Sequence, residues 1–186
     1  MYSKIPFIKG QFDENERLAL TEFEKFAGYL PKIYTSWTGT PSSTRVDVFG
    51  SNYTGGCEYI ELKKRSEKAD KYPDCFIEKE KFKAMMDNWE ERGCFPIYIN
   101  FIGDYKNVYV FYLPEVVDIE EHKNVVITHQ NGLKSREDRY GLQWDQAHHY
   151  IYNEATDNYI VTGPRIKKKI EKKAEQWKKR NHPCQD

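Results

Sequence analysis

The stretch VDVFGSNYTGGCEYIELKKR, residues 46–65, decides the predicted fold because it contains two short apolar runs separated by a turn-rich segment. Residues 44–50 and 56–65 are rich in the β-branched and aromatic residues typical of strands, and the Ser, Asn and Gly residues between them favour a turn. We therefore expect a pair of strands. Asp47 lies between two valines in the first strand, and Glu61 lies between Ile60 and Leu62 in the second.

Side chains alternate between the two faces of a strand, so Glu61 and Lys63 share one face while Ile60 and Leu62 take the other. By the same alternation Asp47 points away from its two valine neighbours. If the strands pair, both acids enter one cleft. Two carboxylates that lie close together repel each other and are costly to desolvate. A hard cation such as Mg²⁺, which prefers oxygen ligands, removes that cost, and Lys63 would then act on a water bound to the metal.

An alternative interpretation needs no metal. In it the two strands form a solvent-facing edge, where Glu61 pairs with Lys63 and Asp47 with Arg45 as ordinary surface residues.

The flanking sequence predicts a mixed α/β fold. Residues 12–30 have apolar residues at helical spacing, with Asp13 as N-cap and Glu16 in a capping-box position. Residues 32–39 indicate another strand. Residues 75–93 predict a second amphipathic helix that ends at Gly93, and 95–103 and 107–117 predict two more strands. This order indicates a mixed central sheet flanked by helices, with a core over residues 1–117.

Residues 118–186 are expected to form a C-terminal extension packed on the same domain. The segment YIVTG at 159–163 predicts a late strand, and residues 164–180 predict a basic helix that begins at Pro164. The cations of this helix, Lys168 and Lys172 among them, would contact phosphates. In the alternative interpretation the helix packs by its apolar face and its lysines only meet water.

Composition narrows the functional classes. Lys and Arg number 29, as do Asp and Glu, so net charge predicts no polyanionic partner. Aromatic residues make up 15% of the chain, which argues against disorder. No apolar run approaches the ~20 residues needed to span a bilayer, and no secretory signal is recognised. The four cysteines lack metal-ligand spacing, so we expect reduced thiols in a cytoplasmic protein without membrane contact.

The order of motifs resembles the PD-(D/E)xK nuclease superfamily, and within it archaeal-type Holliday-junction resolvases and small phage and VRR-type nucleases. The likeness covers about residues 9–113, and Val46 stands where the family name has proline. The motifs that carry it are KG at 9–10, ER at 16–17, TGTPSS at 38–43, VDV at 46–48 and IELK at 60–63. The resemblance implies a restriction-endonuclease-like αβββαβ core, a deoxyribonuclease dependent on Mg²⁺ (or Mn²⁺), branched DNA as substrate, and a homodimer.

Residue by residue, the resemblance implies metal binding by Asp47 and Glu61, with Glu16 assisting, and a catalytic role for Lys63. A capping role remains the alternative for Glu16. Lys81, with Lys79 as its competitor, stands near the place of a Gln or Lys that many relatives carry in the following helix. The candidate DNA contacts in the first half of the chain are Lys9, Arg17, Thr40, Ser42, Ser43 and Lys81. Two rival functions remain: a nucleic-acid-binding module without catalysis, and a non-enzymatic interaction protein.

Overall fold

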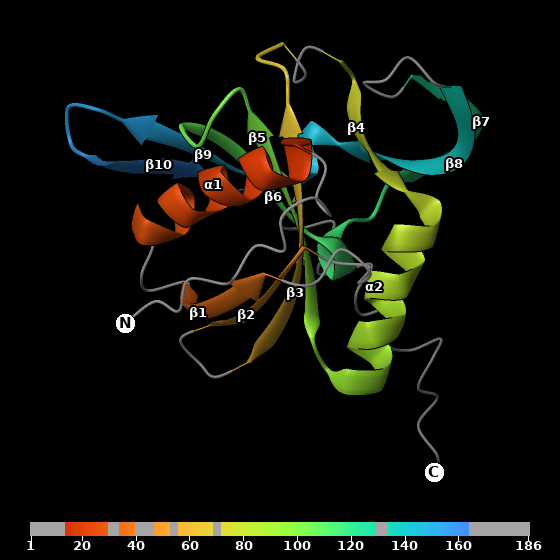
Figure 1. Cartoon of the computed structure of the whole chain (residues 1–186), viewed down its shortest axis with the longest axis horizontal. Coiled ribbons are helices and arrows are strands. Elements are labelled where there is room, and N and C mark those ends of the chain that lie inside the picture. Colours follow the sequence, from red (N-terminus) through yellow and green to blue (C-terminus); the bar gives the residue numbers. More distant parts are fainter. Residues whose placement is uncertain are drawn as a thin grey trace.

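The described part of the chain contains two β-sheets and two α-helices, with short 3₁₀-helices at Leu113–Glu115 and Trp144–Gln146 (Figure 1). The computed structural model describes residues 14–29, 34–39, 47–52, 56–68, 72–128 and 134–163. The larger sheet has seven strands in the order β1-β2-β3-β5-β6-β9-β10. Its strands are β1 (Tyr34–Gly39), β2 (Val48–Asn52), β3 (Cys57–Arg65), β5 (Phe95–Ile102), β6 (Asn107–Tyr112), β9 (His148–Asn153) and β10 (Asn158–Thr162).

The seven-stranded sheet is mixed. Strands β3 and β5 pair in parallel, with Glu61 opposite Tyr98, whereas its other neighbouring strands pair antiparallel. A parallel pair needs a crossover connection, and the chain between β3 and β5 supplies it through β4 (Asp74–Glu78) and the helix α2 (Lys79–Arg92). The α/β class with a mixed central sheet and two helices, predicted from the sequence, is confirmed.

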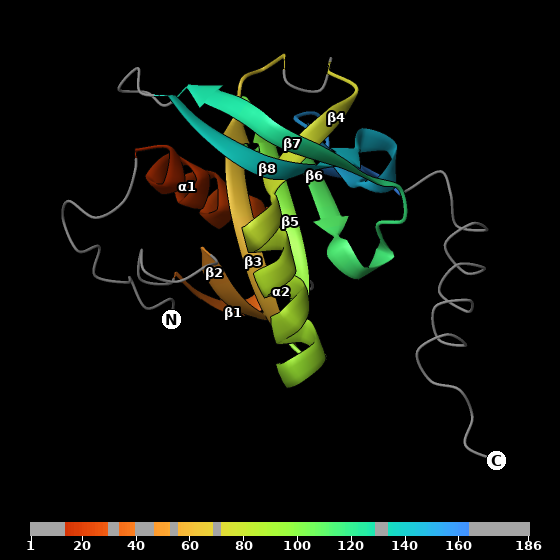
Figure 2. The same ribbon diagram turned by 90° about the vertical axis from the view of Figure 1, so that its right-hand side faces the viewer.

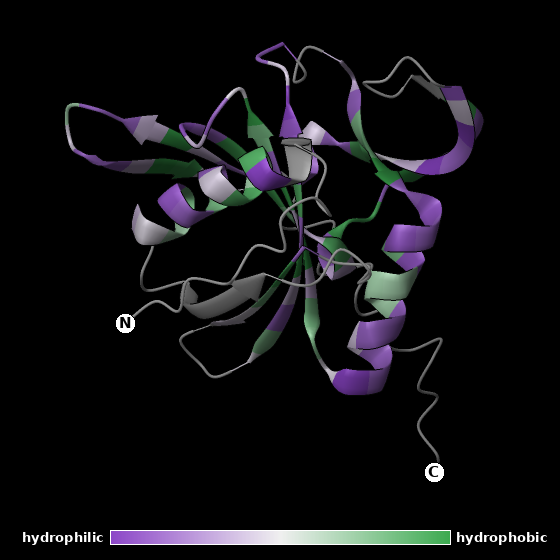
Figure 3. Ribbon diagram, in the orientation of Figure 1, coloured by the Kyte–Doolittle hydropathy of each residue, from purple (hydrophilic) through white to green (hydrophobic). Residues whose placement is uncertain are grey.

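Helix α1 (Glu14–Tyr29) covers one face of this sheet. Phe23 and Phe26 of the helix share a buried cluster with Ile60 and Leu62 of β3 and the odd-numbered residues of β5, and the ring of Phe26 packs edge-on against that of Phe101. The predicted apolar stripe of this helix is therefore the stripe that meets the sheet. Figure 3 shows apolar residues concentrated along the central strands beneath the helix.

Helix α2 lies against the opposite face (Figure 2). Its Met85 is fully buried beside Tyr98 of β5 and Phe111 of β6. The second sheet, in the order β4-β8-β7, continues this layer through β7 (Ile119–Thr128) and β8 (Lys134–Gln143). Alternation along β3 thus separates two environments: Ile60 and Leu62 face α1, while Glu61 faces α2.

The predicted helix over 75–93 is wrong in its first turn. Residues Asp74–Glu78 form strand β4, which pairs antiparallel with β8, and α2 begins at Lys79. Cys75 and Ile77 are buried on the same side of β4, so the apolar pattern that we assigned to a helix has the two-residue period of a strand at this point. The predicted end is confirmed, because Gly93 terminates the helix in a left-handed conformation at φ 70°.

The polar region after residue 118 contains more regular structure than its sequence predicts. Strands β7 and β8 pair with each other and with β4, and β9 and β10 extend the large sheet. The predicted late strand at 159–163 is confirmed as β10. The predicted basic helix over 164–180 lies outside the described residues.

The expectation of four reduced thiols is also corrected. Cys57 and Cys94 form a disulfide, with their Cα atoms 4.8 Å apart. Cys57 begins β3 and Cys94 precedes β5, and the parallel register that sets Glu58 opposite Phe95 brings the two cysteines side by side. Cys75 is a free, buried thiol, and Cys184 lies outside the described residues. Neither described helix is long and apolar enough to cross a membrane.

Candidate active site

Asp47 is held at the start of β2 by two hydrogen bonds to β3. Its backbone N–H donates to the carbonyl oxygen of Ile60 at 3.1 Å. Its carboxylate Oδ2 accepts the backbone N–H of Leu62 at 2.8 Å. These bonds fix the carboxylate beside the middle of β3, because the register of the pair sets Val48 opposite Ile60.

Glu61 lies in the middle of β3 and is only 4% exposed. Lys81, in the first turn of α2, donates from Nζ to Glu61 Oε1 at 2.6 Å. The other carboxylate oxygen, Oε2, is buried and has no hydrogen-bond partner among the described residues. A buried acceptor without a partner is unfavourable by about 1–3 kcal/mol, and more when it carries charge, so this oxygen is a candidate ligand for a cation.

Electrostatics show that the two carboxylates interact. Burial raises the pKa of Glu61 well above its usual range, the charge of Asp47 and a hydrogen bond with its side chain raise it further, and Lys81 opposes these effects. For Lys81, burial lowers the pKa, but the charge and the hydrogen bond of Glu61 outweigh it, so the net shift is upward. The centre therefore combines a charged ammonium with an acid pair whose full ionisation is unfavourable without further positive charge.

The structure brings together three predicted site residues, Asp47, Glu61 and Lys81. Lys81 rather than Lys79 faces the acids, because Lys79 instead forms an ion pair with Glu121 of β7. Lys63 follows Glu61 on the same face of β3, two positions along, and is exposed.

Of the other predicted site residues, Arg17 has a described side chain, and no described contact brings it to this centre, whereas the side chain of Glu16 lies outside the described part of the chain. Glu16 and Arg17 belong to α1, where Arg17 is exposed. The remaining candidates lie outside the described residues: Lys9, Thr40, Ser42, Ser43, Lys168 and Lys172.

Sequence reasoning missed Arg65, which shares the face of Glu61 and Lys63 on β3. Its guanidinium donates to the carbonyl oxygen of Phe76 at 2.7 Å and to the Tyr98 hydroxyl at 2.8 Å, and it also contacts the side chain of Asn100. Burial lowers the pKa of Arg65, but its neighbours reverse the shift and raise it overall. The run of basic residues at 63–65 indicates that cationic side chains lie near Glu61, but the sequence alone does not show which of them is buried.

The donor set of this centre suits a particular chemistry. Asp47 and Glu61 offer only carboxylate oxygens, which are preferred by hard divalent cations such as Mg²⁺ and Mn²⁺. Lys63, Arg65 and Lys81 give the same face of the sheet three cationic side chains. Cations around a metal are the groups that stabilise a phosphate anion.

Comparisons with known proteins assign no family to the chain. No protein-family model matches it, and a search of curated proteins finds no significant match.

Proposed function

We propose that the protein is a metal-dependent deoxyribonuclease of the PD-(D/E)xK type. Two features support a restriction-endonuclease-like core. The first is the order of α1, β1, β2, β3, α2 and β5, with β4 as an addition before α2. The second is the parallel pairing of β3 with β5 through a crossover that contains α2, with α1 packed on the opposite face of the sheet.

One observation carries the proposal. The buried Oε2 of Glu61 has no hydrogen-bond donor among the described residues when both acids are ionised, and the nearby charge of Asp47 makes the ionisation of Glu61 still less favourable. A Mg²⁺ or Mn²⁺ held by Asp47 and Glu61 satisfies both acids. Glu16 stays a candidate for a third ligand. When bound, the metal supplies Lewis-acid stabilisation of the phosphate and a more acidic water.

The protein's own side chains supply the remaining functions. Lys81 holds Glu61 in place and keeps part of its charge compensated. Lys63, exposed on the same face of β3, would orient the attacking water or offset charge on the scissile phosphate. Arg65 is fixed by its contacts with Phe76 and Tyr98, and its contribution is to the positive field along β3 rather than to bond cleavage.

The test is cleavage of linear, nicked and four-way-junction DNA in the presence of Mn²⁺. We expect the wild type to cut at least one of these DNAs, and Asp47→Asn, Glu61→Gln and Lys63→Met to lose the activity. Glu90→Gln is the matched control, because it changes an exposed acid of α2. A wild type that cuts none of the DNAs, or a Lys63→Met variant that cuts as well as the wild type, contradicts the proposal. The product of a junction substrate reports whether branched DNA is preferred.

One observation favours a second candidate, a DNA-binding module without catalysis. The Lys81–Glu61 ion pair already satisfies one oxygen of the central acid without any metal. On this alternative the protein binds DNA with a steep salt dependence that Asp47→Asn and Glu61→Gln leave unchanged. DNA binding without cleavage by the wild type would support it.

A further inference from the structure

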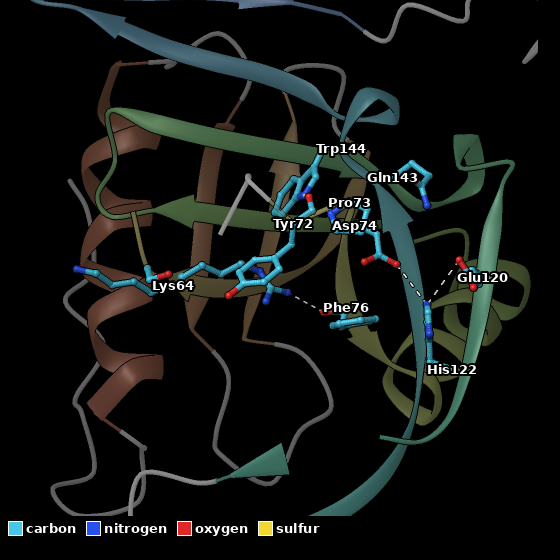
Figure 4. A pocket seen from close by; sticks show the side chains of 11 residues that line it. Lys64, Tyr72, Pro73, Asp74, Phe76, Glu120, His122, Gln143 and Trp144 are labelled. Carbon is cyan, nitrogen blue, oxygen red and sulfur yellow. Dashed lines mark hydrogen bonds and ion pairs between the residues drawn. The ribbon is translucent and has the colours of Figure 1, made fainter. Parts of the chain in front are cut away.

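A second group of metal-binding side chains lies on the three-stranded sheet. Asp74 begins β4, and Glu120 and His122 are alternate residues of β7, so all three lie on one face of this sheet (Figure 4). His122 Nε2 is 3.3 Å from Asp74 Oδ2 and 3.9 Å from Glu120 Oε2. One ligand atom from each residue lies within 4.8 Å of the other two. Asp74 is buried, His122 is partly exposed and Glu120 is exposed.

The middle strand makes room for this group. Gly141 of β8 stands opposite Phe76 of β4 and Glu120 of β7. A Cβ atom at Gly141 would lie 2.1 Å from Asp74 Oδ2 and 2.8 Å from His122 Nε2, distances that no packed structure tolerates. The absence of a side chain at this one position is therefore what lets the carboxylate and the imidazole meet above β8.

The imidazole is held in one orientation by packing. The ring of Phe76 contacts His122 edge-to-face, with centroids 5.0 Å apart and an interplanar angle of 86°. In this orientation Nε2 faces both carboxylates (Figure 4).

The spacing fits a tetrahedral metal. Zinc binds imidazole nitrogen and carboxylate oxygen at about 2.0–2.2 Å, so neighbouring ligand atoms around a tetrahedral ion lie about 3.4 Å apart. The Asp74–His122 distance of 3.3 Å already has this value, and the Glu120–His122 distance of 3.9 Å exceeds it by an amount that an exposed side chain can close. One imidazole with two carboxylates suits Zn²⁺ and its first-row neighbours better than Mg²⁺.

We propose that Asp74, Glu120 and His122 form a binding site for Zn²⁺ or a similar first-row divalent ion, separate from the Asp47–Glu61 centre. The site faces a pocket of about 710 Å³ that is also lined by Tyr72, Gln143 and Trp144. Three protein ligands leave a tetrahedral zinc one open position, and the pocket leaves that position accessible to water or to an exogenous ligand.

The competing account is an ordinary ion pair. Arg65 lines the same pocket, and a protonated His122 together with this guanidinium would compensate Asp74 without a metal. The two accounts differ in one measurable respect: only the metal site requires the exposed carboxylate of Glu120, because an ion pair between His122 and Asp74 persists without it.

The test is Zn²⁺ binding by isothermal titration calorimetry, on full-length protein whose affinity tag has been removed and whose Cys184 is replaced by serine. The titration uses a background that carries Asp47→Asn and Glu61→Gln, because the carboxylates of the other centre would also bind Zn²⁺. In this background we expect one Zn²⁺ to bind per chain, and Glu120→Gln and His122→Asn each to weaken binding by at least about tenfold, since even partners that only orient a ligand contribute about 10–100-fold. Glu90→Gln and His148→Asn in the same background are the matched controls, an exposed acid of α2 and a histidine of β9, and both should bind Zn²⁺ as that background does.

A second measurement separates loss of the site from loss of the fold. Because Glu120 is exposed, Glu120→Gln should leave the urea midpoint of the metal-free protein unchanged, while the rise in that midpoint on adding Zn²⁺ should be smaller than in the wild type. The inference is overturned if the titrated background takes up no stoichiometric Zn²⁺, or if Glu120→Gln and His122→Asn bind it as tightly as that background does. Neither result bears on Mn²⁺-dependent DNA cleavage, so this test and that of the nuclease fail independently.

Discussion

The protein has two acid clusters, the first formed by Asp47 and Glu61 and the second by Asp74, Glu120 and His122. The negative charge of their carboxylates is compensated differently in the two. Glu61 is buried in the central sheet, where the ammonium of Lys81 compensates one of its oxygens. Glu120, with a side chain 66% exposed, lies at the surface of the small sheet, and the only nitrogen within reach in its group is that of His122. Burial makes a nearby cation necessary at the first cluster, whereas water can compensate much of the charge at the second.

The two clusters also differ in the metal ion that their ligand atoms favour. A set of carboxylate oxygens favours Mg²⁺ or Mn²⁺, while the addition of an imidazole shifts the preference toward zinc. If both proposals hold, each cluster can be removed without affecting the other, and the following measurements test that independence.

The largest effect is expected on DNA cleavage. Glu61→Gln should lower the Mn²⁺-dependent rate by at least about 10³-fold, because metal stabilisation of the transition state is worth several kcal/mol and each ~1.4 kcal/mol is tenfold. His122→Asn should leave the rate unchanged. A time course of junction or nicked-DNA cleavage measures both. Loss of cleavage in His122→Asn with the fold intact would mean that the two clusters act as one site.

Lys81→Met should lower the free energy of unfolding of the metal-free protein by about 2–4 kcal/mol, because it leaves the buried Glu61 without its partner. Urea denaturation in a chelating buffer measures this, and added Mn²⁺ should recover part of the loss. Lys83→Met, an exposed lysine of the same helix, is the control and should change stability by less than about 0.5 kcal/mol. Equal losses in the two variants would contradict the role assigned to Lys81.

The pH dependence of stability should report the raised pKa of Glu61. The carboxyl group of Glu61 binds its proton more tightly in the folded protein than in the unfolded chain. Protonated Glu61 therefore stabilises the folded protein at pH values below the ordinary pKa of a carboxyl group. This contribution is lost as pH rises through the raised pKa of the folded state. The stability of the metal-free wild type relative to Glu61→Gln should therefore fall with pH, by at most about 1.4 kcal/mol per pH unit. Urea unfolding over a pH series checks the sign. A relative stability that rises with pH would contradict the assignment.

The smallest effect concerns Cys75, the residue after Asp74. Its thiol is buried on the opposite face of β4, and burial raises its pKa to about 12. It should therefore resist alkylation by iodoacetamide in the native Cys184→Ser protein, with or without Zn²⁺, and react only on unfolding. Mass spectrometry of the alkylated protein measures this. If Cys75 resisted alkylation only when Zn²⁺ was added, its thiol would be one of the metal ligands and the second cluster would have to include it.

The first cluster could be predicted in part because its acids lie in one continuous stretch. Two-residue alternation sets Glu61 opposite its apolar neighbours, and the antiparallel pairing of β2 with β3 brings Asp47 beside it. The choice between Lys79 and Lys81 could not be made from sequence, because it depends on where α2 begins. The helix begins at Lys79, and Lys81 then faces the acids.

The second cluster could not be predicted, because its residues come from strands that are distant in the chain. Asp74 lies just before the helix predicted over 75–93 but begins strand β4, and the polar character of β7 gave no strand signal. Only the register that sets both Phe76 and Glu120 opposite Gly141 brings these side chains together. The register between strands that are distant in the chain cannot be predicted from local sequence patterns.

The disulfide between Cys57 and Cys94 encloses β3, β4 and α2 in one covalent ring. Along the chain, Glu61 precedes the connection between β3 and β4 and Lys81 follows it. Ser66, Glu67 and Lys68 of this connection are exposed. A protease that cuts this connection would therefore open the ring without releasing either half. The two fragments would migrate as one species until a reductant is added, and the oxidised protein would keep its ion pair across a broken chain.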